Sequence, residues 1–176
     1  MEVKTFYLVT GNAGKLREWQ RMFPASIELR AHDIDIDEIQ SLDKVAIVKD
    51  KATKAYEQVG EPVIVEDVSA ELDELEGLPG PFIKYFEQAL GSDALYKLCR
   101  NDNSPATIVV TLACYDGAEF VIAEGRVRGT VVASRGNGGF GFDHCFVPDG
   151  QTKTYAEMTP TEKDSISHRS AAIKDL

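Results

Sequence analysis

The segment from residue 6 to residue 23 constrains the fold most, because it has the pattern of a strand, a glycine turn and a helix. Residues 6–9 form a short apolar run that is typical of a buried strand. The turn Thr10-Gly-Asn-Ala-Gly-Lys15 follows directly, and apolar side chains then recur at helical spacing at Leu16, Trp19 and Met22. A strand that enters a helix in this way favours an α/β fold.

The same turn suits the binding of an anion. Its backbone N–H groups would lie at the N-terminus of a helix, where negative charge is stabilised. Lys15 adds a positive charge that suits phosphate. The segment is not a Walker A loop, since Val9 stands five residues before Gly14, and Leu16 replaces the Ser or Thr that would hold magnesium. An ordinary turn with a surface lysine explains these residues equally well.

Along the rest of the chain, helical and strand patterns alternate first, and strand patterns then cluster. Expected helices cover residues 42–59, with Ser41 as the N-cap, residues 82–90 and residues 93–99. Expected strands cover residues 26–31, 63–65, 108–115, 119–124, 126–133 and 142–147. Thr159-Pro-Thr-Glu162 predicts a capping box at the start of one more helix. This order predicts a mixed sheet with flanking helices, and one domain over the 176 residues.

The charge balance argues against two classes of partner. The net charge is -10, whereas a nucleic-acid backbone or an anionic membrane needs a basic surface. A single nucleotide that arrives with a divalent cation remains compatible, because clustered carboxylates attract such a cation. Cys99, Cys114 and Cys145 lack the spacing of a zinc site or a disulfide framework, which favours a reducing compartment. Without a membrane-spanning stretch or a signal-peptide pattern, a cytoplasmic location is expected.

Two acidic stretches are candidates for a metal site. Glu66 and Asp67 end a predicted buried strand, where acids are costly unless they bind a cation, pair or reach solvent. Neighbours on a strand point to opposite faces, so one of them can face a site while the other supports it. Glu38, in the acidic segment of residues 33–38, is a further candidate ligand. A charged, solvated loop explains Glu38 equally well.

A second group of residues suits a flat, hydrogen-bonding ligand such as a nucleobase. Gly139-Phe-Gly-Phe-Asp143 places two aromatic rings and a carboxylate on a glycine-rich loop. Ser167-His-Arg169 adds a hydroxyl, an imidazole and a guanidinium. Aromatic faces stack on bases, and Arg and His read base edges. In the alternative interpretation, His168 and Arg169 only cap and salt-bridge the last helix.

Seven motifs occur in one order along the chain: Thr10-Gly-Asn-Ala-Gly-Lys15, Val65-Glu-Asp67, Gly77-Leu-Pro-Gly-Pro81, Gly139-Phe-Gly-Phe-Asp143, Thr154-Tyr-Ala-Glu-Met158, Glu162-Lys163 and Ser167-His-Arg169. With them the chain resembles the inosine/xanthosine triphosphate pyrophosphatase family, the Ham1-like enzymes. The resemblance implies a long mixed sheet, two lobes around an active-site groove, and a homodimer. It also implies magnesium-dependent hydrolysis of ITP, dITP and XTP to the monophosphate and pyrophosphate, which cleanses the nucleotide pool.

The resemblance further implies roles for individual residues. Asp67 is expected to activate water with Glu66 assisting, and Glu38 and Asp67 are expected to bind the metal. The residues expected to contact the phosphates or the rest of the substrate are Thr10, Gly11, Asn12, Lys15, Lys51, Val68 and Lys84. The residues expected around the base are Phe140, Gly141, Phe142, Asp143, Lys163, Ser167, His168 and Arg169.

The chain departs from many bacterial members of that family at two motifs. It reads Glu66-Asp-Val-Ser69 and Gly80-Pro-Phe-Ile-Lys-Tyr85, where it is closer to the eukaryotic form, and Lys84 replaces an arginine. Two other functions stay open: a related pyrophosphatase that prefers modified pyrimidine triphosphates, and a nucleotide-binding module without activity. Lys15, Asp67 and Ser167-His-Arg169 are all present, which favours the enzyme over the module.

Overall fold

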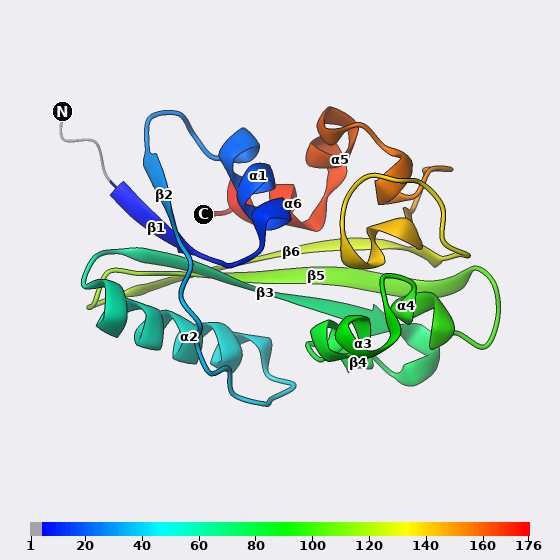
Figure 1. Cartoon of the computed structure of the whole chain (residues 1–176), viewed down its shortest axis with the longest axis horizontal. Helices are drawn as coiled ribbons and strands as arrows, with labels where there is room; N and C mark the ends of the chain where they lie inside the picture. Colours follow the sequence, from blue (N-terminus) through cyan, green and yellow to red (C-terminus); the bar gives the residue numbers. More distant parts are fainter. Residues whose placement is uncertain (1–4) are drawn as a thin grey trace. The chain divides into compact units, whose positions relative to one another are not determined.

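The sheet has seven strands in a computed structural model that describes residues 5–176 (Figure 1). The strands are β1 Thr5–Val9, β2 Glu28–His32, β3 Val63–Leu72, β4 Pro79–Gly80, β5 Ser104–Tyr115, β6 Phe120–Val131 and β7 Phe146–Pro148. The α-helices are α1 Ala13–Met22, α2 Lys44–Val59, α3 Ile83–Leu90, α4 Ala94–Lys97, α5 Pro160–Ile166 and α6 His168–Lys174. The 3-10 helices are η1 Asp73–Leu75, η2 Gly141–His144 and η3 Tyr155–Glu157. None of the helices in this part of the chain is long and apolar enough to span a membrane.

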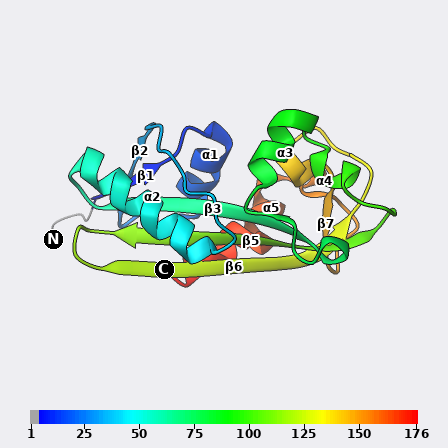
Figure 2. The same ribbon diagram turned by 90° about the horizontal axis from the view of Figure 1, so that it is seen from below.

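The strand pairs make this sheet mixed. The strand order is β2-β1-β3-β5-β6-β7, and β4 pairs with β3 outside this path. Strand β1 is parallel to β2 and to β3, whereas β4 is antiparallel to β3, and β7 is antiparallel to β6. The two longest strands, β5 and β6, lie side by side (Figure 2). The predicted α/β fold with a mixed sheet and flanking helices is therefore confirmed.

The chain divides into two compact units. Unit 1 contains the chain up to Asp67, Thr111–Glu124 and Ala172–Leu176, and unit 2 contains Val68–Val110 and Gly125–Ala171. Strands β3, β5 and β6 contribute residues to both units. That the two units form one domain stays a prediction.

In unit 1, helices α1 and α2 lie on opposite sides of the strands (Figure 1). Helix α2 has small and β-branched residues along one face, and this face packs on the strands. The buried residues of this core are Val9, Val48, Ala52, Ala55, Val63, Val65 and Ala113. The packing fixes the first half of β3, which leads directly to Glu66 and Asp67.

In unit 2, a larger apolar core forms around the far end of β3. Its buried residues come from several strands and helices and are Ala70, Leu72, Ile83, Leu95, Ala106, Ile108, Val131, Phe142, Cys145, Phe146, Tyr155 and Met158. The core includes a ring from the motif predicted to bind a base, because Phe142 is buried in it.

The structure confirms the predicted N-terminal cap of helix α5 and corrects that of helix α2. The capping box at α5 is confirmed, since the Thr159 hydroxyl accepts from the Glu162 N–H at 3.2 Å and the Glu162 carboxylate accepts from the Thr159 N–H at 2.7 Å. The predicted N-cap of α2 is wrong. Asp43, not Ser41, accepts the N–H groups of Val45 and Ala46, each at 3.0 Å. The Ser41 hydroxyl instead accepts the N–H of Asp43, two residues further along the chain, at 3.0 Å.

Three strand predictions are also wrong. Strand β3 continues to Leu72, so Glu66 and Asp67 lie within the strand and not at its end. Strand β6 is continuous through Gly125, where two strands were expected. Residues 142–147 do not form one strand, because η2 occupies Gly141–His144 and only Phe146–Pro148 is extended. In each case the pairing with neighbouring strands decides where the extended backbone begins and ends.

Candidate active site

The turn after β1 is held by its own side chains. The Thr10 hydroxyl accepts the N–H of Asn12 at 3.1 Å, and Asn12 caps α1. The Asn12 Oδ1 accepts the N–H groups of Gly14 at 2.8 Å and Lys15 at 3.1 Å. The cap therefore satisfies two of the amides that the sequence had assigned to an anion, and Lys15 remains as the source of positive charge. At Gly11, a Cβ would lie 2.7 Å from the Asp33 carboxylate.

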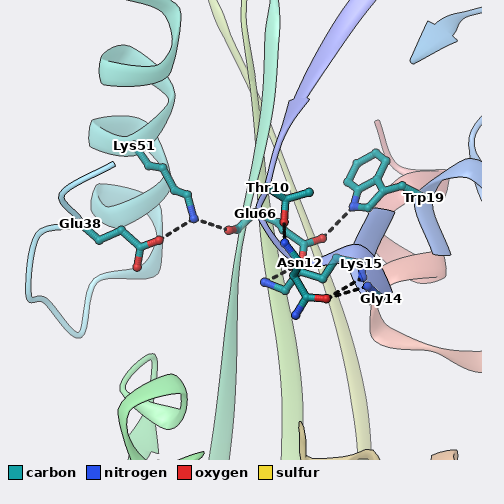
Figure 3. A network of polar contacts seen from close by, with 8 residues as sticks. All are labelled: Thr10, Asn12, Gly14, Lys15, Trp19, Glu38, Lys51 and Glu66. Carbon is teal, nitrogen blue, oxygen red and sulfur yellow. Dashed lines mark hydrogen bonds and ion pairs between the residues drawn. The ribbon is translucent and has the colours of Figure 1, made fainter. Parts of the chain in front are cut away.

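Two lysines and three carboxylates form a lysine–carboxylate cluster in unit 1: Lys15, Lys51, Glu38, Glu66 and Asp67. Figure 3 shows the first four of these residues. The Lys15 Nζ lies 3.0 Å from the Glu66 Oε1. The Lys51 Nζ lies 2.6 Å from the Glu38 Oε1 and donates to the Glu66 backbone oxygen at 3.2 Å. Such pairing lowers the cost of placing charged groups near the sheet.

Glu66 is held at both of its carboxylate oxygens. Besides the Lys15 ion pair at Oε1, the indole N–H of Trp19 donates to the Glu66 Oε2 at 2.8 Å (Figure 3). Glu66 is 2% exposed, and Trp19 is fully buried. A carboxylate with a donor at each oxygen is fixed in orientation. The sequence had given Trp19 no role beyond an apolar helix face.

Asp67 differs from its neighbour in both contacts and ionisation. Its Oδ2 atom is buried and has no hydrogen-bond partner. Burial raises the pKa of Asp67 from its ordinary 3.8 to about 6, although Lys51 and Lys15 act in the opposite direction. The charges of Glu38 and Glu66 raise this pKa further. A carboxylate with a pKa near neutrality and an available oxygen suits a general base.

The lysine–carboxylate cluster fits a metal ion that is shared with a substrate. Within residues 5–176, no group of three His, Cys, Asp or Glu side chains is arranged to hold a metal on its own. The charge of Glu38 raises the pKa of Asp67, as expected for two carboxylates that repel each other, and the Asp67 Oδ2 has no hydrogen-bond partner. Magnesium usually takes one or two carboxylates together with substrate phosphates and water. The donor set therefore fits magnesium in the presence of a phosphate ligand.

Unit 2 contains a contrasting aromatic–lysine cluster, formed by Phe140, Asp143, Tyr155 and Lys163. The Lys163 Nζ lies 2.6 Å from the Asp143 Oδ2, and both side chains are almost completely buried. The same Nζ lies 4.9 Å from the centre of the Phe140 ring and 5.2 Å from that of Tyr155. Asp143 also accepts the N–H of Phe140 at 2.9 Å, so the carboxylate fixes the loop as well as the lysine.

The two phenylalanines of the glycine loop lie in different environments. Phe142 is 8% exposed within the core, with its ring tilted against that of His168 at 6.0 Å. Phe140 is only half-buried. The burial of Phe142 favours a packing role for this ring and leaves Phe140 as the ring with an exposed face. Glu87 of α3 holds the loop between them, because its carboxylate accepts the N–H of Phe142 at 2.8 Å.

The remaining predicted substrate residues are spread over unit 2. Ser167, His168 and Arg169 are all buried at the start of α6, and the Ser167 hydroxyl accepts the N–H of Ser170 at 3.1 Å. Val68 is half-buried against the core of unit 2, whereas Lys84 is exposed on α3. Gly141 has a φ of +53°, and a Cβ there would lie 2.5 Å from the Glu87 carboxylate. The roles of all these residues stay predictions.

Three residues at these clusters were missing from the predicted site: Trp19, Glu87 and Tyr155. Trp19 lies four positions after Lys15, so helical spacing places both on one face of α1. Tyr155 belongs to the motif Thr154-Tyr-Ala-Glu-Met158, for whose residues the sequence predicted no individual role. Nothing in the sequence indicates Glu87, because its partner Phe142 is 55 residues away.

Comparisons with known proteins identify the family of this chain. The model of the Ham1 family matches residues 6–176. An inosine triphosphate pyrophosphatase of Phaeosphaeria nodorum is 44% identical over 172 residues, which cover 96% of this chain and 89% of that protein. The one of Yarrowia lipolytica is 40% identical over 173 residues, which cover 96% of this chain and 91% of that protein.

Solved structures show the same fold. A HAM1 protein from Coxiella burnetii has a TM-score of 0.81 and 26% identity, covering 99% of this chain and 96% of that one. A nucleoside-triphosphatase, dITP/XTP pyrophosphatase, from Mycobacterium abscessus has a TM-score of 0.72 and 27% identity, covering 97% of each chain. The resemblance seen in the seven sequence motifs is thereby confirmed, and this chain belongs to the Ham1 family.

Proposed function

We infer that the chain is a nucleoside-triphosphate pyrophosphatase that hydrolyses non-standard purine nucleoside triphosphates, namely ITP, dITP and XTP. The products are the nucleoside monophosphate and pyrophosphate, so the enzyme removes these nucleotides from the pool. Relatives that share 40% or more of their residues with it are inosine triphosphate pyrophosphatases. The observation that carries the inference is the buried Oδ2 of Asp67, without a hydrogen-bond partner and beside Lys15 and Lys51.

The triphosphate is bound by the turn after β1 and by the two lysines of unit 1. Lys15 and Lys51 supply positive charge, and both side chains are partly exposed. Thr10, Gly11 and Asn12 bring backbone and side-chain polar groups to the same helix N-terminus, where negative charge is favoured. The acidic net charge of the chain does not prevent this binding, because the charges next to the ligand dominate.

Asp67 accepts a proton from the water that attacks a phosphorus of the α–β phosphoanhydride. The new P–O bond forms as the bond to the leaving pyrophosphate breaks, and the proton of the water passes to the Asp67 Oδ2. Glu66 assists because it fixes Lys15 and, through its backbone oxygen, Lys51. Glu38 and Asp67 would hold Mg²⁺ together with the phosphates, and the metal would neutralise charge on the phosphate oxygens.

The base is recognised by residues of unit 2. The half-buried Phe140 ring offers a face for stacking, and its loop is fixed by Asp143 and Lys163. Arg169 and His168 donate hydrogen bonds to the 6-oxo group of hypoxanthine or xanthine. Adenine carries an amino donor at that position, so two donors would face each other. A site that requires such a bond discriminates by about 10⁴-fold or more. Further contacts are assigned to Gly141, Ser167, Val68 and Lys84, and Phe142 supports the loop from within the core.

Assembly and compartment belong to the same proposal. A homodimer is supported by the family resemblance, and sedimentation of the purified chain measures it directly. A cytoplasmic location is supported by the three cysteines, which form no disulfide within residues 5–176.

The activity is tested on the purified chain with ITP, dITP, XTP, GTP, ATP and a modified pyrimidine triphosphate, each with Mg²⁺ and with EDTA. Products are separated so that pyrophosphate is distinguished from phosphate. We expect monophosphate and pyrophosphate from the three non-standard purines, and Asp67→Asn as the inactive control. Release of single phosphates, or a preference for the pyrimidine, would overturn the assignment.

A further inference from the structure

We propose that Trp19 is a positioning residue for this reaction, whose indole N–H holds Glu66 so that Glu66 in turn places Lys15 at the phosphates. The role deepens the proposed function and rests on it. Trp19 does not touch the substrate in this proposal. It acts through one hydrogen bond, from its Nε1 to the Glu66 Oε2 at 2.8 Å.

The geometry is that of a clamp between a helix and a strand. Lys15 and Trp19 lie one turn apart on α1, and each engages a different oxygen of the same carboxylate (Figure 3). Glu66 lies in β3, immediately before Asp67. The clamp therefore ties the start of α1, which carries the phosphate-binding turn, to the strand that carries the proposed general base.

The burial of Glu66 makes the indole N–H of Trp19 important for its carboxylate. Glu66 is 2% exposed, so water reaches its carboxylate poorly. Without the N–H, the Glu66 Oε2 loses a charge-assisted hydrogen bond at a place that water reaches poorly, which is costly. The carboxylate would then turn toward Lys15, which lies 3.0 Å from its Oε1. Lys15 would be drawn away from the phosphates, because its side chain is the more exposed partner of that ion pair.

The competing explanation is that Trp19 only fills the core. Its ring is fully buried, and it packs on Phe23 with ring centres 5.5 Å apart. A packing role depends on the shape of the ring, whereas the positioning role depends on its N–H. Any test must therefore remove the N–H and keep the ring.

The chain offers this test because Trp19 is its only tryptophan. Biosynthetic replacement of tryptophan by β-(3-benzothienyl)alanine puts sulfur in place of the N–H and changes no other residue. We expect the KM for ITP to rise about tenfold, as for the loss of one charge-assisted hydrogen bond, with kcat within about twofold. Phe23→Leu is the matched control, since it removes the ring contact and keeps the N–H, and it should leave KM unchanged.

A double-mutant cycle with Lys15 distinguishes the positioning role of Trp19 from a general loss of folded structure. Trp19→Phe should raise KM in the wild-type background and leave it unchanged in the Lys15→Met background, because the residue that Trp19 places is then absent. Independent effects, with Trp19→Phe raising KM equally in both backgrounds, would overturn the proposal. So would a sulfur-substituted chain with normal KM and a lowered melting temperature.

A binding measurement distinguishes failure of this role from failure of the proposed function. Inorganic tripolyphosphate, titrated calorimetrically in the presence of EDTA, reports on Lys15 without a base, a metal or turnover. We expect its Kd to weaken about tenfold in the sulfur-substituted chain, and an unchanged Kd would overturn the clamp. If the sulfur substitution weakens this Kd while the unsubstituted chain hydrolyses no nucleotide, the clamp is supported and the proposed function is overturned.

Discussion

The lysine–carboxylate cluster of unit 1 and the aromatic–lysine cluster of unit 2 use the same charges in opposite ways. In unit 1 the lysines are partly exposed, and the Asp67 Oδ2 lacks a hydrogen-bond partner. In unit 2 the Lys163–Asp143 pair is almost completely buried between aromatic rings. Partly exposed lysines beside a carboxylate oxygen without a hydrogen-bond partner suit chemistry on phosphate. A buried ion pair whose groups are hydrogen-bonded suits a rigid recognition surface. Under the proposed function, the reaction takes place at the first cluster and the base is selected at the second.

The largest expected effect is the loss of activity in Asp67→Asn. An amide cannot accept the proton of the attacking water, so kcat should fall at least about 10³-fold while the fold is retained. Steady-state kinetics with ITP and Mg²⁺ measure the change, and circular dichroism checks the fold. Asp175→Asn, an exposed acid near the C-terminus, is the control. Turnover near that of the wild type would remove Asp67 from the role of general base.

The next effect concerns stability and separates the two clusters. Lys163→Met leaves Asp143 as a buried charge without its lysine, which should cost about 3–5 kcal/mol of unfolding free energy. Lys51→Met, in the less deeply buried pair with Glu38, should cost less, about 1–2 kcal/mol. Urea denaturation of both variants measures the difference. Equal losses would contradict the distinction between a rigid cluster and an accessible one.

The raised pKa of Asp67 predicts opposite pH dependences for activity and stability. A general base must be ionised, so kcat/KM should fall as the pH drops through about 6. For stability, the folded chain binds the Asp67 proton more tightly than the unfolded chain, whose carboxyl keeps the ordinary pKa of 3.8. Asp67 therefore reduces the stability progressively as the pH rises from about 4 to about 6.

The Asp67→Asn substitution removes the loss of stability that the ionisation of Asp67 causes. At pH 7 the variant should unfold with a free energy higher than that of the wild type by up to about 3 kcal/mol, and at pH 4 the two should be equal. Chemical denaturation at both pH values, with EDTA present, tests this. A variant that is less stable at pH 7 would show that the Asp67 Oδ2 has favourable contacts in the folded chain.

Much of the fold was predictable because local patterns carry it. The strand, turn and helix over residues 6–23 are confirmed as β1 and α1, and the Thr159 capping box is confirmed at α5. The N-cap of α2 was mistaken because Ser41 and Asp43 are both good caps, and only the backbone geometry chooses between them. The length of β3 was underestimated because strand ends depend on pairing partners outside the segment itself, here β4 and β5.

The sequence proposed members for the candidate site, but it did not predict their contacts. Motifs identified Lys15, Glu66 and Asp67, yet Trp19 appeared only as part of an apolar helix face. Its partner Glu66 lies 47 residues away, and no local rule connects the two. The same limit applies to Phe142, which the sequence offered as a stacking ring and the structure buries in the core. Whether a side chain is buried depends on the whole fold, so a sequence motif alone does not predict it.

The division between reaction and selection is tested most directly by one pair of variants, Lys15→Ala and Arg169→Leu. The measurement is kcat/KM for ITP, GTP and ATP in both variants and in the wild type. Lys15→Ala should lower the values for all three nucleotides by a similar factor, about 10- to 100-fold, because every triphosphate needs the same charge. Its ITP/GTP ratio should stay constant.

Arg169→Leu should instead collapse the ratio of ITP to ATP, mainly through slower turnover of ITP, by about 10²-fold or more. ATP should remain a poor substrate, because nothing new accepts a bond from its amino group. Constant nucleotide ratios in Arg169→Leu, with only the melting temperature lowered, would contradict the assignment of base recognition to this residue. A changed ITP/GTP ratio in Lys15→Ala would contradict the assignment of phosphate binding to unit 1.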